Sequence, residues 1–252
     1  MKHSSQRQPP STSGDSVPAA ARTVFGATLP LAERYRDWLA TAGVERGLVG
    51  PRETDRLWER HLLNSAVLEP WLPAQGTVLD LGSGAGLPGI VLALLRPDLN
   101  VILLEPMLRR VTFLDEVVAD LGLPRTTVVR ARAEDLAGQR PRSADVVVAR
   151  AVAPLARLIG WAAPLIAPGG FLLALKGETV TQELTEAHAA RCAAGMAPAD
   201  VHPVTVGGTV THVVQLTGDR TNVTNTDKSN KSMHSAGHRH HSPPHEGGTG
   251  GR

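Results

Sequence analysis

Short apolar runs alternate with segments of helical periodicity through the middle of this sequence. The apolar runs occupy residues 77–82, 100–105, 126–130, 144–149 and 170–175. Between the second and third runs, Leu108, Val111 and Leu114 recur at the spacing that places side chains on one face of a helix. Strands that alternate with helices in this way predict a doubly wound parallel sheet with helices on both faces.

After the fifth strand, the pattern predicts a helix near residues 179–193 and then two more strands. These are the apolar runs at about 200–206 and 209–216, which Gly207 and Gly208 join in the manner of a hairpin turn. The final strand should therefore pair antiparallel. The fold class that we expect is α/β, a Rossmann-like sheet with an antiparallel last strand.

Upstream of the sheet, residues 28–72 have helical periodicity, with Pro30 near one helix start and a break at residues 43–51. We therefore expect a small helical N-terminal subdomain at 25–74, followed by the sheet domain at 75–218. Polar, low-complexity segments at 1–24 and 219–252 predict disordered tails, the second of them rich in histidine.

Three arginines in the expected helical subdomain, Arg52, Arg56 and Arg60, follow one another at a spacing of four residues. On an α-helix this spacing places them on one face, where they could meet phosphates. The alternative is a solvated face on which they pair with Glu53 and Glu59. The pattern leaves both interpretations open.

Composition limits the class of protein. One cysteine, Cys192, excludes a disulfide framework within the chain and a cysteine-cluster metal site, and we expect a buried structural thiol there. No apolar run can span a bilayer or act as a signal peptide. A net charge of +2 is compatible with nucleic-acid binding but too small to indicate it. We expect a cytoplasmic, monomeric enzyme that binds no metal and no membrane.

The strongest chemical signal is the glycine-rich turn that follows the first strand. Glycines at positions 82, 84 and 86 let the backbone approach a ligand closely. The segment 84–89 also fits the dinucleotide-binding spacing. The carboxylate of Asp80, two residues before Gly82, would repel a pyrophosphate but attract a cation. This favours S-adenosylmethionine, which carries a sulfonium and an ammonium. The alternative is that Asp80 only caps the turn.

Two further carboxylates follow neighbouring strands at the edge where open α/β sheets bind ligands. Glu105 closes the second strand, where a carboxylate can accept both ribose hydroxyls. Glu134 follows the third strand, where an adenine amine could be met. Either could also be a helix cap, but together they describe a trough for an adenosine.

These segments resemble the bacterial RsmG family, also called glucose-inhibited division protein B. The resemblance covers about residues 28–216, and it is carried by the runs 60–65, 80–90, 103–105, 132–134, 150–153 and 173–177. It implies S-adenosylmethionine-dependent methylation of guanine N7 at position 527 of 16S rRNA, in the 530 loop of the small ribosomal subunit or its precursor.

Carried over by position, the resemblance implies cofactor contacts at a small set of residues. They are Gly82, Leu87, Ala133, Glu134 and Arg150. Gly84 and Glu105 join this set from the loop and strand-end arguments above. The sequence departs from the family pattern at Asn64, Ala149 and Pro106, which puts in doubt a carboxylate at 64 or a hydroxyl at 149.

The residues after the fourth strand also bear on the acceptor atom. They are Ala-Arg-Ala-Val-Ala-Pro at 149–154, without the Asn/Asp-Pro-Pro-aromatic run common in methylation of exocyclic amines. Cys192 is badly placed for attack on a pyrimidine. Guanine N7 carries no proton, so we expect no catalytic acid or base, only positioning by Arg150 and by Lys176, the single lysine outside the expected tails. The alternatives are an NAD(P)-dependent oxidoreductase and a noncatalytic RNA-binding protein.

Overall fold

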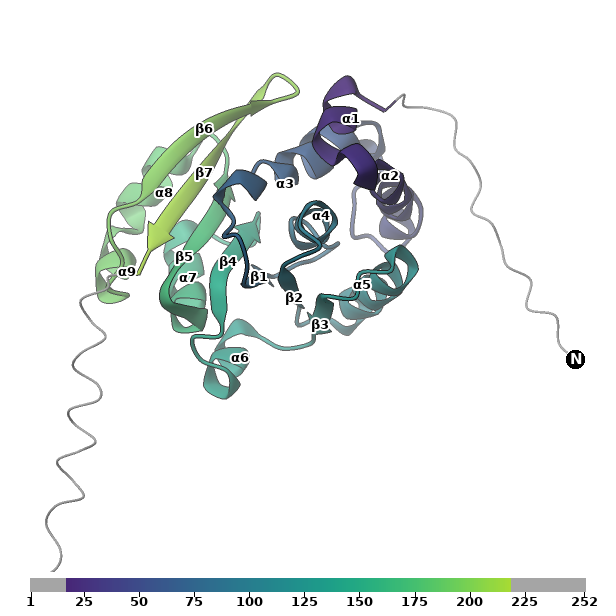
Figure 1. Cartoon of the computed structure of the whole chain (residues 1–252). Helices are drawn as coiled ribbons and strands as arrows, with labels where there is room; N and C mark the ends of the chain where they lie inside the picture. Colours follow the sequence, from purple (N-terminus) through teal and green to yellow (C-terminus); the bar gives the residue numbers. More distant parts are fainter. Residues whose placement is uncertain (1–16, 219–252) are drawn as a thin grey trace, which may run out of the picture. The chain divides into compact units, whose positions relative to one another are not determined.

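Seven strands form one sheet at the centre of the protein, whose computed structural model describes residues 17–218 (Figure 1). The strands are β1 (Thr77–Leu81), β2 (Asn100–Leu104), β3 (Thr126–Val129), β4 (Ala144–Arg150), β5 (Ile166–Lys176), β6 (Asp200–Val206) and β7 (Thr209–Thr217). Their order is β3-β2-β1-β4-β5-β7-β6. Strands β1 to β5 are parallel, and β7 runs antiparallel to both of its neighbours. The expected fold class is confirmed.

Helices cover both faces of this sheet (Figure 1). On one face lie α1 (Ala19–Phe25), α2 (Leu29–Trp38), α3 (Asn64–Ala66), α4 (Gly89–Leu95) and α5 (Leu108–Leu121). On the other lie α6 (Ala133–Gln139), α7 (Leu155–Ala162), α8 (Val180–Glu186) and α9 (His188–Ala193). No helix among residues 17–218 is long and apolar enough to cross a membrane.

Short 3₁₀ and π segments complete the chain path. The 3₁₀ segments are η1 (Gly26–Thr28), η3 (Pro51–Arg56), η5 (Glu69–Trp71) and η6 (Ala163–Leu165), and the π segments are η2 (Leu39–Gly43) and η4 (Leu57–Leu63). Most of them lie between α1 and β1, so the N-terminal helical region is less regular than its periodicity indicates.

Alternating strand side chains divide the interior into two apolar clusters. Val78 and Val146 point toward the N-terminal helices, α4 and α5, whereas Leu79 and Val147 point toward α6 and α7. The first cluster contains buried residues of both the N-terminal helices and the sheet. The junction expected at residues 74 and 75 is thus a change of secondary structure within one continuous core.

The helical region begins earlier than expected. Helix α1 starts at Ala19, inside the segment that we expected to be a tail up to residue 24, because Ala21 and Phe25 are buried in the core. The Phe25 ring packs edge to face against Trp58, with ring centroids 6.1 Å apart. The expected tails at residues 1–16 and 219–252, including the His-rich segment, lie outside the described residues.

Two expectations about side chains need correction. Arg52 and Arg56 lie on a 3₁₀ segment and Arg60 on a π segment, so the three do not share one regular α-helical face. Arg60 instead pairs with Glu53 at 3.0 Å. Cys192 is exposed, not buried, and it lies on α9, a short helix in which no residue is buried.

Replacing Phe25 with alanine tests whether α1 belongs to the core. Loss of this buried ring should lower the free energy of unfolding by about 3–5 kcal/mol, measured by denaturant titration. Val24, its neighbour, is 43% exposed, so Val24→Ala is the matched control and should cost about 0.5 kcal/mol or less. Equal, small effects of both substitutions would contradict the placement of α1.

Candidate active site

The glycine-rich turn between β1 and α4 has a backbone that only glycine adopts readily. Gly82 and Gly84 have φ angles of +71° and +58°. A Cβ at Gly82 would also come within 2.9 Å of the Val152 side chain, which belongs to the segment after β4. The turn is thus packed closely against the end of the neighbouring strand.

Backbone N–H groups of the turn are engaged by protein acceptors. Those of Gly82 and Ser83 donate to the Leu104 carbonyl at 2.9 and 3.0 Å, and those of Gly86 and Leu87 donate to the Ser83 carbonyl at 2.7 and 3.1 Å. A pyrophosphate in the dinucleotide mode needs free N–H groups at this place. The observed hydrogen bonds therefore disfavour the dinucleotide interpretation.

Glu105 holds the glycine turn through hydrogen bonds, and it also lines the cavity beside the turn. The side chain is 1% exposed; its Oε2 accepts a hydrogen bond from the Gly84 N–H, and its Oε1 accepts one from the Met107 N–H, both at 3.0 Å. Arg110 lies 3.5 Å from Oε2. The carboxylate thus fixes the Gly84 backbone at the end of β2.

Asp80 does not face the cofactor side of the turn, contrary to the first of our two expectations. Its side chain is fully buried, and its Oδ2 accepts a hydrogen bond from the Gly89 N–H at 2.9 Å, at the start of α4. It therefore caps the turn, as the alternative held. Burial raises the pKa of Asp80 to about 7, although the Gly89 hydrogen bond acts in the opposite direction.

A cavity of about 560 Å³ lies beside the turn at the carboxyl ends of the strands. All seven residues expected to contact the cofactor line it: Gly82, Gly84, Leu87, Glu105, Ala133, Glu134 and Arg150. They come from the ends of β1, β2, β3 and β4, which meet where the strand order reverses. A glycine turn beside open space, with a buried carboxylate at the next strand end, fits an adenosine-bearing cofactor.

Sequence reasoning missed other residues of this cavity. Leu48 and His61 come from the N-terminal helical region, and Trp161 comes from α7. His61 lies in the 60–65 run that carried the resemblance, which could have indicated it. Leu48 and Trp161 follow only the general apolar pattern, so nothing in the sequence distinguishes them from core residues.

The N-terminal helices hold the glycine turn directly. The Tyr35 hydroxyl of α2 donates a hydrogen bond to the Ala85 carbonyl at 2.9 Å, and Tyr35 is completely buried. Burial, with the nearby Asp80 carboxylate, raises the pKa of Tyr35 well above its usual value. The hydroxyl therefore keeps its proton and remains a donor.

Arg150, at the end of β4, makes the second link to these helices. Its guanidinium donates to the His61 carbonyl at 3.0 Å and to the Ser65 hydroxyl at 3.1 Å, and its Nη2 lies 2.8 Å from His61 Nδ1. Arg150 makes no salt bridge to Asp145 or Glu178. Asp145 accepts instead from the Thr77 N–H at 2.7 Å.

His61 continues this network toward the surface. Burial lowers the pKa of His61, and the adjacent Arg150 guanidinium lowers it further. A neutral imidazole can accept from Arg150 at Nδ1 and donate from Nε2 to the Glu53 carboxylate, 3.1 Å away. Arg150 is thus held by groups that the sequence places 85 and 89 residues before it.

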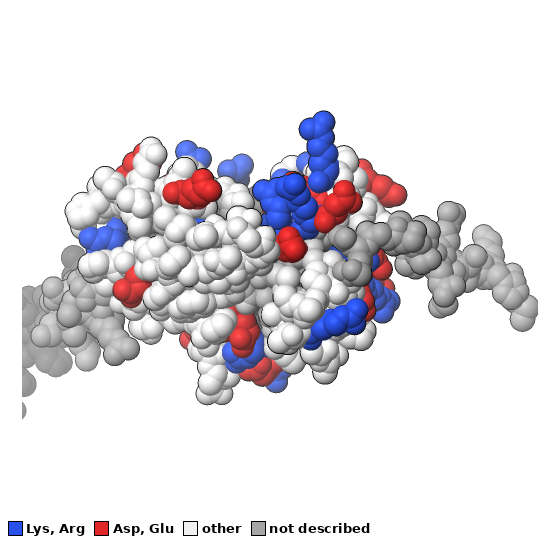
Figure 2. Space-filling view, turned by 90° about the horizontal axis from the view of Figure 1, so that it is seen from above, with Lys and Arg blue, Asp and Glu red and all other residues white. Residues whose placement is uncertain are grey.

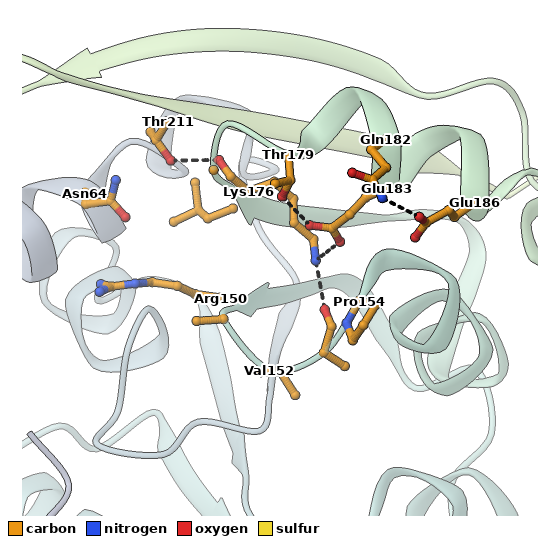
Figure 3. A pocket seen from close by; sticks show the side chains of 14 residues that line it. Asn64, Arg150, Val152, Pro154, Lys176, Thr179, Gln182, Glu183, Glu186 and Thr211 are labelled. Atoms are coloured by element: carbon orange, nitrogen blue, oxygen red, sulfur yellow. Dashed lines mark hydrogen bonds and ion pairs between the residues drawn. The ribbon is translucent and has the colours of Figure 1, made fainter.

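Lys176 lies apart from the first cavity. It is 9% exposed, which excludes a surface lysine, and its Nζ donates to the Ala153 carbonyl at 2.8 Å and to Glu183 at 2.7 Å. It lines a second cavity of about 620 Å³, which Figure 3 shows. The two cavities share only Arg150, Ala151 and Val152 in their linings.

The surface charge is mixed on the face that Figure 2 shows. One cluster of Lys and Arg lies there with Asp and Glu beside it, other charged residues are scattered, and most of that face carries neither. This agrees with the small net charge of +2. The charges on this face therefore form no broad basic field of the kind that attracts nucleic acid.

Asp80 should make stability depend on pH. Its pKa rises from 3.8 to about 7 on folding, so the folded protein binds more protons than the unfolded chain between those values. The free energy of unfolding should therefore fall as the pH rises from about 4 to about 7. Asp80→Asn, which keeps an acceptor for Gly89, should flatten this part of the profile in denaturant titrations. Parallel profiles would contradict the assignment.

Comparison with known proteins finds sequences that are similar over most of the described residues. A family model described as rRNA small subunit methyltransferase G (GidB) matches residues 28–210. A protein named ribosomal RNA small subunit methyltransferase G from Nocardioides sp. is 61% identical over 173 residues, 68% of either chain. One of the same name from Mycobacterium marinum is 56% identical over 189 residues, 75% of this chain and 82% of the relative.

Solved structures support the fold. The chain resembles a putative S-adenosylmethionine-dependent methyltransferase from Methanococcus maripaludis with a TM-score of 0.52 and 14% identity, over 73% of this chain and 94% of that one. Because the family model spans most of the described residues, the resemblance noted in the sequence is confirmed. The chain belongs to the rRNA small subunit methyltransferase G family.

Proposed function

We propose that this protein methylates N7 of the guanine at position 527, in the 530 loop of 16S rRNA, within the small ribosomal subunit or its precursor. The observation that carries the proposal is that residues from four strand ends line one cavity beside the glycine turn. The names of its relatives, which specify rRNA of the small subunit, support the substrate class. We propose further that it acts as a cytoplasmic monomer.

Within this proposal, the first cavity holds S-adenosylmethionine, which supplies a methyl group bound to a positively charged sulfur. Glu105 receives the ribose hydroxyls, and Ala133 and Glu134 contact the adenine. Gly82, Gly84 and Leu87 form the wall at the turn, and Arg150 lines the cavity from the end of β4. The buried Glu105 carboxylate suits a cationic cofactor better than an anionic one.

The proposed chemistry needs no general acid or base. Guanine N7 has a lone pair and no proton, so it can form the new N–C bond while the electrons of the broken C–S bond stay on sulfur. Holding the two reactants in line can supply roughly 7–11 kcal/mol of the barrier reduction. Arg150 and Lys176 act in this scheme as positioning residues.

Neither alternative function gains support from a structural observation. A dinucleotide oxidoreductase would need N–H groups that the turn already uses, and the family is one of methyltransferases. A noncatalytic RNA-binding protein would retain the fold without transferring a methyl group. Transfer of labelled methyl from S-adenosylmethionine to rRNA separates that possibility from the proposed one.

Mapping 7-methylguanine in small-subunit rRNA tests the proposal in cells. Cells that contain the protein should carry the modification at the proposed position, and cells that lack it should not. Modification at the same position in both would overturn the proposal, as would a different modified nucleotide that depends on the protein.

Gly84→Val should abolish measurable S-adenosylmethionine binding, or weaken it at least tenfold, because its side chain would extend from a residue that lines the cavity. Gly122 has a similar φ of +63° at the end of α5, outside the cavity. Gly122→Val is therefore a matched control for backbone strain, about 1–2 kcal/mol in each variant. Calorimetry that shows equal affinity in both would place the cofactor elsewhere.

Arg150→Lys should slow methyl transfer roughly tenfold or more, because an ammonium cannot replace the three contacts of the guanidinium fork. Its effect on the thermal midpoint should be comparatively small. Arg22→Lys, at an exposed position of α1 that lines neither cavity, is the control and should leave the rate unchanged. A lowered midpoint with an unchanged rate would assign Arg150 a purely structural role.

A further inference from the structure

The second cavity, of about 620 Å³, directly adjoins the first. Its lining shares Arg150, Ala151 and Val152 with the proposed cofactor site and otherwise comes from the segments that follow β4 and β5, and from β5, α8, β7 and the N-terminal helical region. An acceptor atom must reach the methyl group from a space that borders the cofactor. This cavity meets that requirement, because three residues border both spaces.

The segment that borders both cavities has an unusual backbone. Ala151 has a φ of +52°, which is rare for a residue with a side chain. The structure holds the segment that follows on two sides. Lys176 donates to the Ala153 carbonyl, and the Leu155 N–H donates to Glu183 at 2.8 Å. Such fixed strain is common at functional sites.

The lining can accommodate a planar polar ligand. Val152, Pro154 and Leu175 give apolar surface, while Lys176 and Glu183 place a cation and a carboxylate side by side (Figure 3). The residues that line the cavity include no aromatic ring. A base held there would therefore be recognised mainly through hydrogen bonds at its edge.

Lys176 and Glu183 retain hydrogen-bonding capacity within this arrangement. An ammonium has three N–H donors, and two of them serve Ala153 and Glu183. The Glu183 Oε2 atom accepts from Lys176 and Leu155, whereas Oε1 accepts only from the Thr179 hydroxyl at 3.3 Å. Burial raises the pKa of Glu183, but the hydrogen bond from Lys176 and that from the Leu155 backbone outweigh it and lower the pKa overall.

We propose that the second cavity binds the target guanine and that the Lys176–Glu183 pair reads its Watson–Crick edge. Guanine presents there two donors, N1–H and the N2 amine, beside the O6 acceptor. A carboxylate next to an ammonium offers the complementary order of acceptor and donor. This mode leaves the edge that carries N7 free to face the border with the cofactor cavity, and so the methyl group. The inference rests on the proposed function and adds the residues that select the base.

The sharpest test replaces one donor of the base. Small-subunit rRNA is prepared with either guanine or inosine at the methylated position; inosine lacks the N2 amine but keeps N1–H, O6 and N7. The wild-type protein should methylate the guanine RNA with a kcat/KM roughly tenfold or more above that for the inosine RNA, since a hydrogen bond to a charged group is lost.

Two variants test whether Glu183 is responsible for the preference for guanine over inosine. Glu183→Gln keeps the side-chain volume and one acceptor, and it should reduce the guanine-to-inosine ratio to near one while S-adenosylmethionine affinity stays unchanged. Glu178→Gln removes the same charge from an exposed residue that does not line the cavity, and it should keep the wild-type ratio. Because the readout is a ratio, a partial loss of folded protein in either variant does not alter it.

Binding supplies a second readout that requires no transfer. With S-adenosylhomocysteine bound, wild-type protein should prefer the guanine RNA over the inosine RNA, and Glu183→Gln should not. A Glu183→Gln variant with the full wild-type preference, or a wild-type protein without any preference, would overturn the inference. Absence of 7-methylguanine on the guanine RNA, with the binding preference intact, would instead overturn the proposed function alone.

Discussion

The guanidinium of Arg150 is the interaction on which the site depends. It lies at the end of β4, half-buried, and its three contacts all go to His61 and Ser65 of the N-terminal helical region. Among the described residues, no carboxylate lies within ion-pair distance of it. Losing a hydrogen bond in a partly buried environment costs free energy, because the remaining polar groups are left without a partner. The position of the helical region over the strand ends is therefore coupled to the position of Arg150.

This coupling explains why the helical region and the sheet share one core. Tyr35 adds a buried hydrogen bond to Ala85, so α2 fixes one side of the glycine turn while Glu105 fixes the other through Gly84. The turn is thus shaped before any ligand binds. The two cavities then lie on either side of Arg150, one lined by the turn and the other by the Lys176–Glu183 pair.

Local periodicity was sufficient for the architecture, because strand and helix patterns depend on neighbouring residues. It also placed Glu105 and Glu134 at strand ends, which topology brings to one edge. It could not orient Asp80, since which side of a strand faces the ligand depends on the helix packed there. Nor could it anticipate the contacts of Arg150 with His61 and Ser65, which join residues far apart in the sequence. The spacing of Arg52, Arg56 and Arg60 wrongly predicted one shared helical face, because 3₁₀ and π turns replace the expected α-helix at 51–63.

A double-mutant cycle between Arg150→Ala and Ser65→Ala, measured on S-adenosylmethionine affinity by calorimetry, tests the central coupling most directly. Ser65 is fully buried and does not line either cavity, so any effect it has must pass through its neighbours. The account predicts a coupling free energy of about 1 kcal/mol, because each substitution removes the same hydrogen bond. Effects that add to within about 0.3 kcal/mol would show that the helical region does not position Arg150 for the cofactor site.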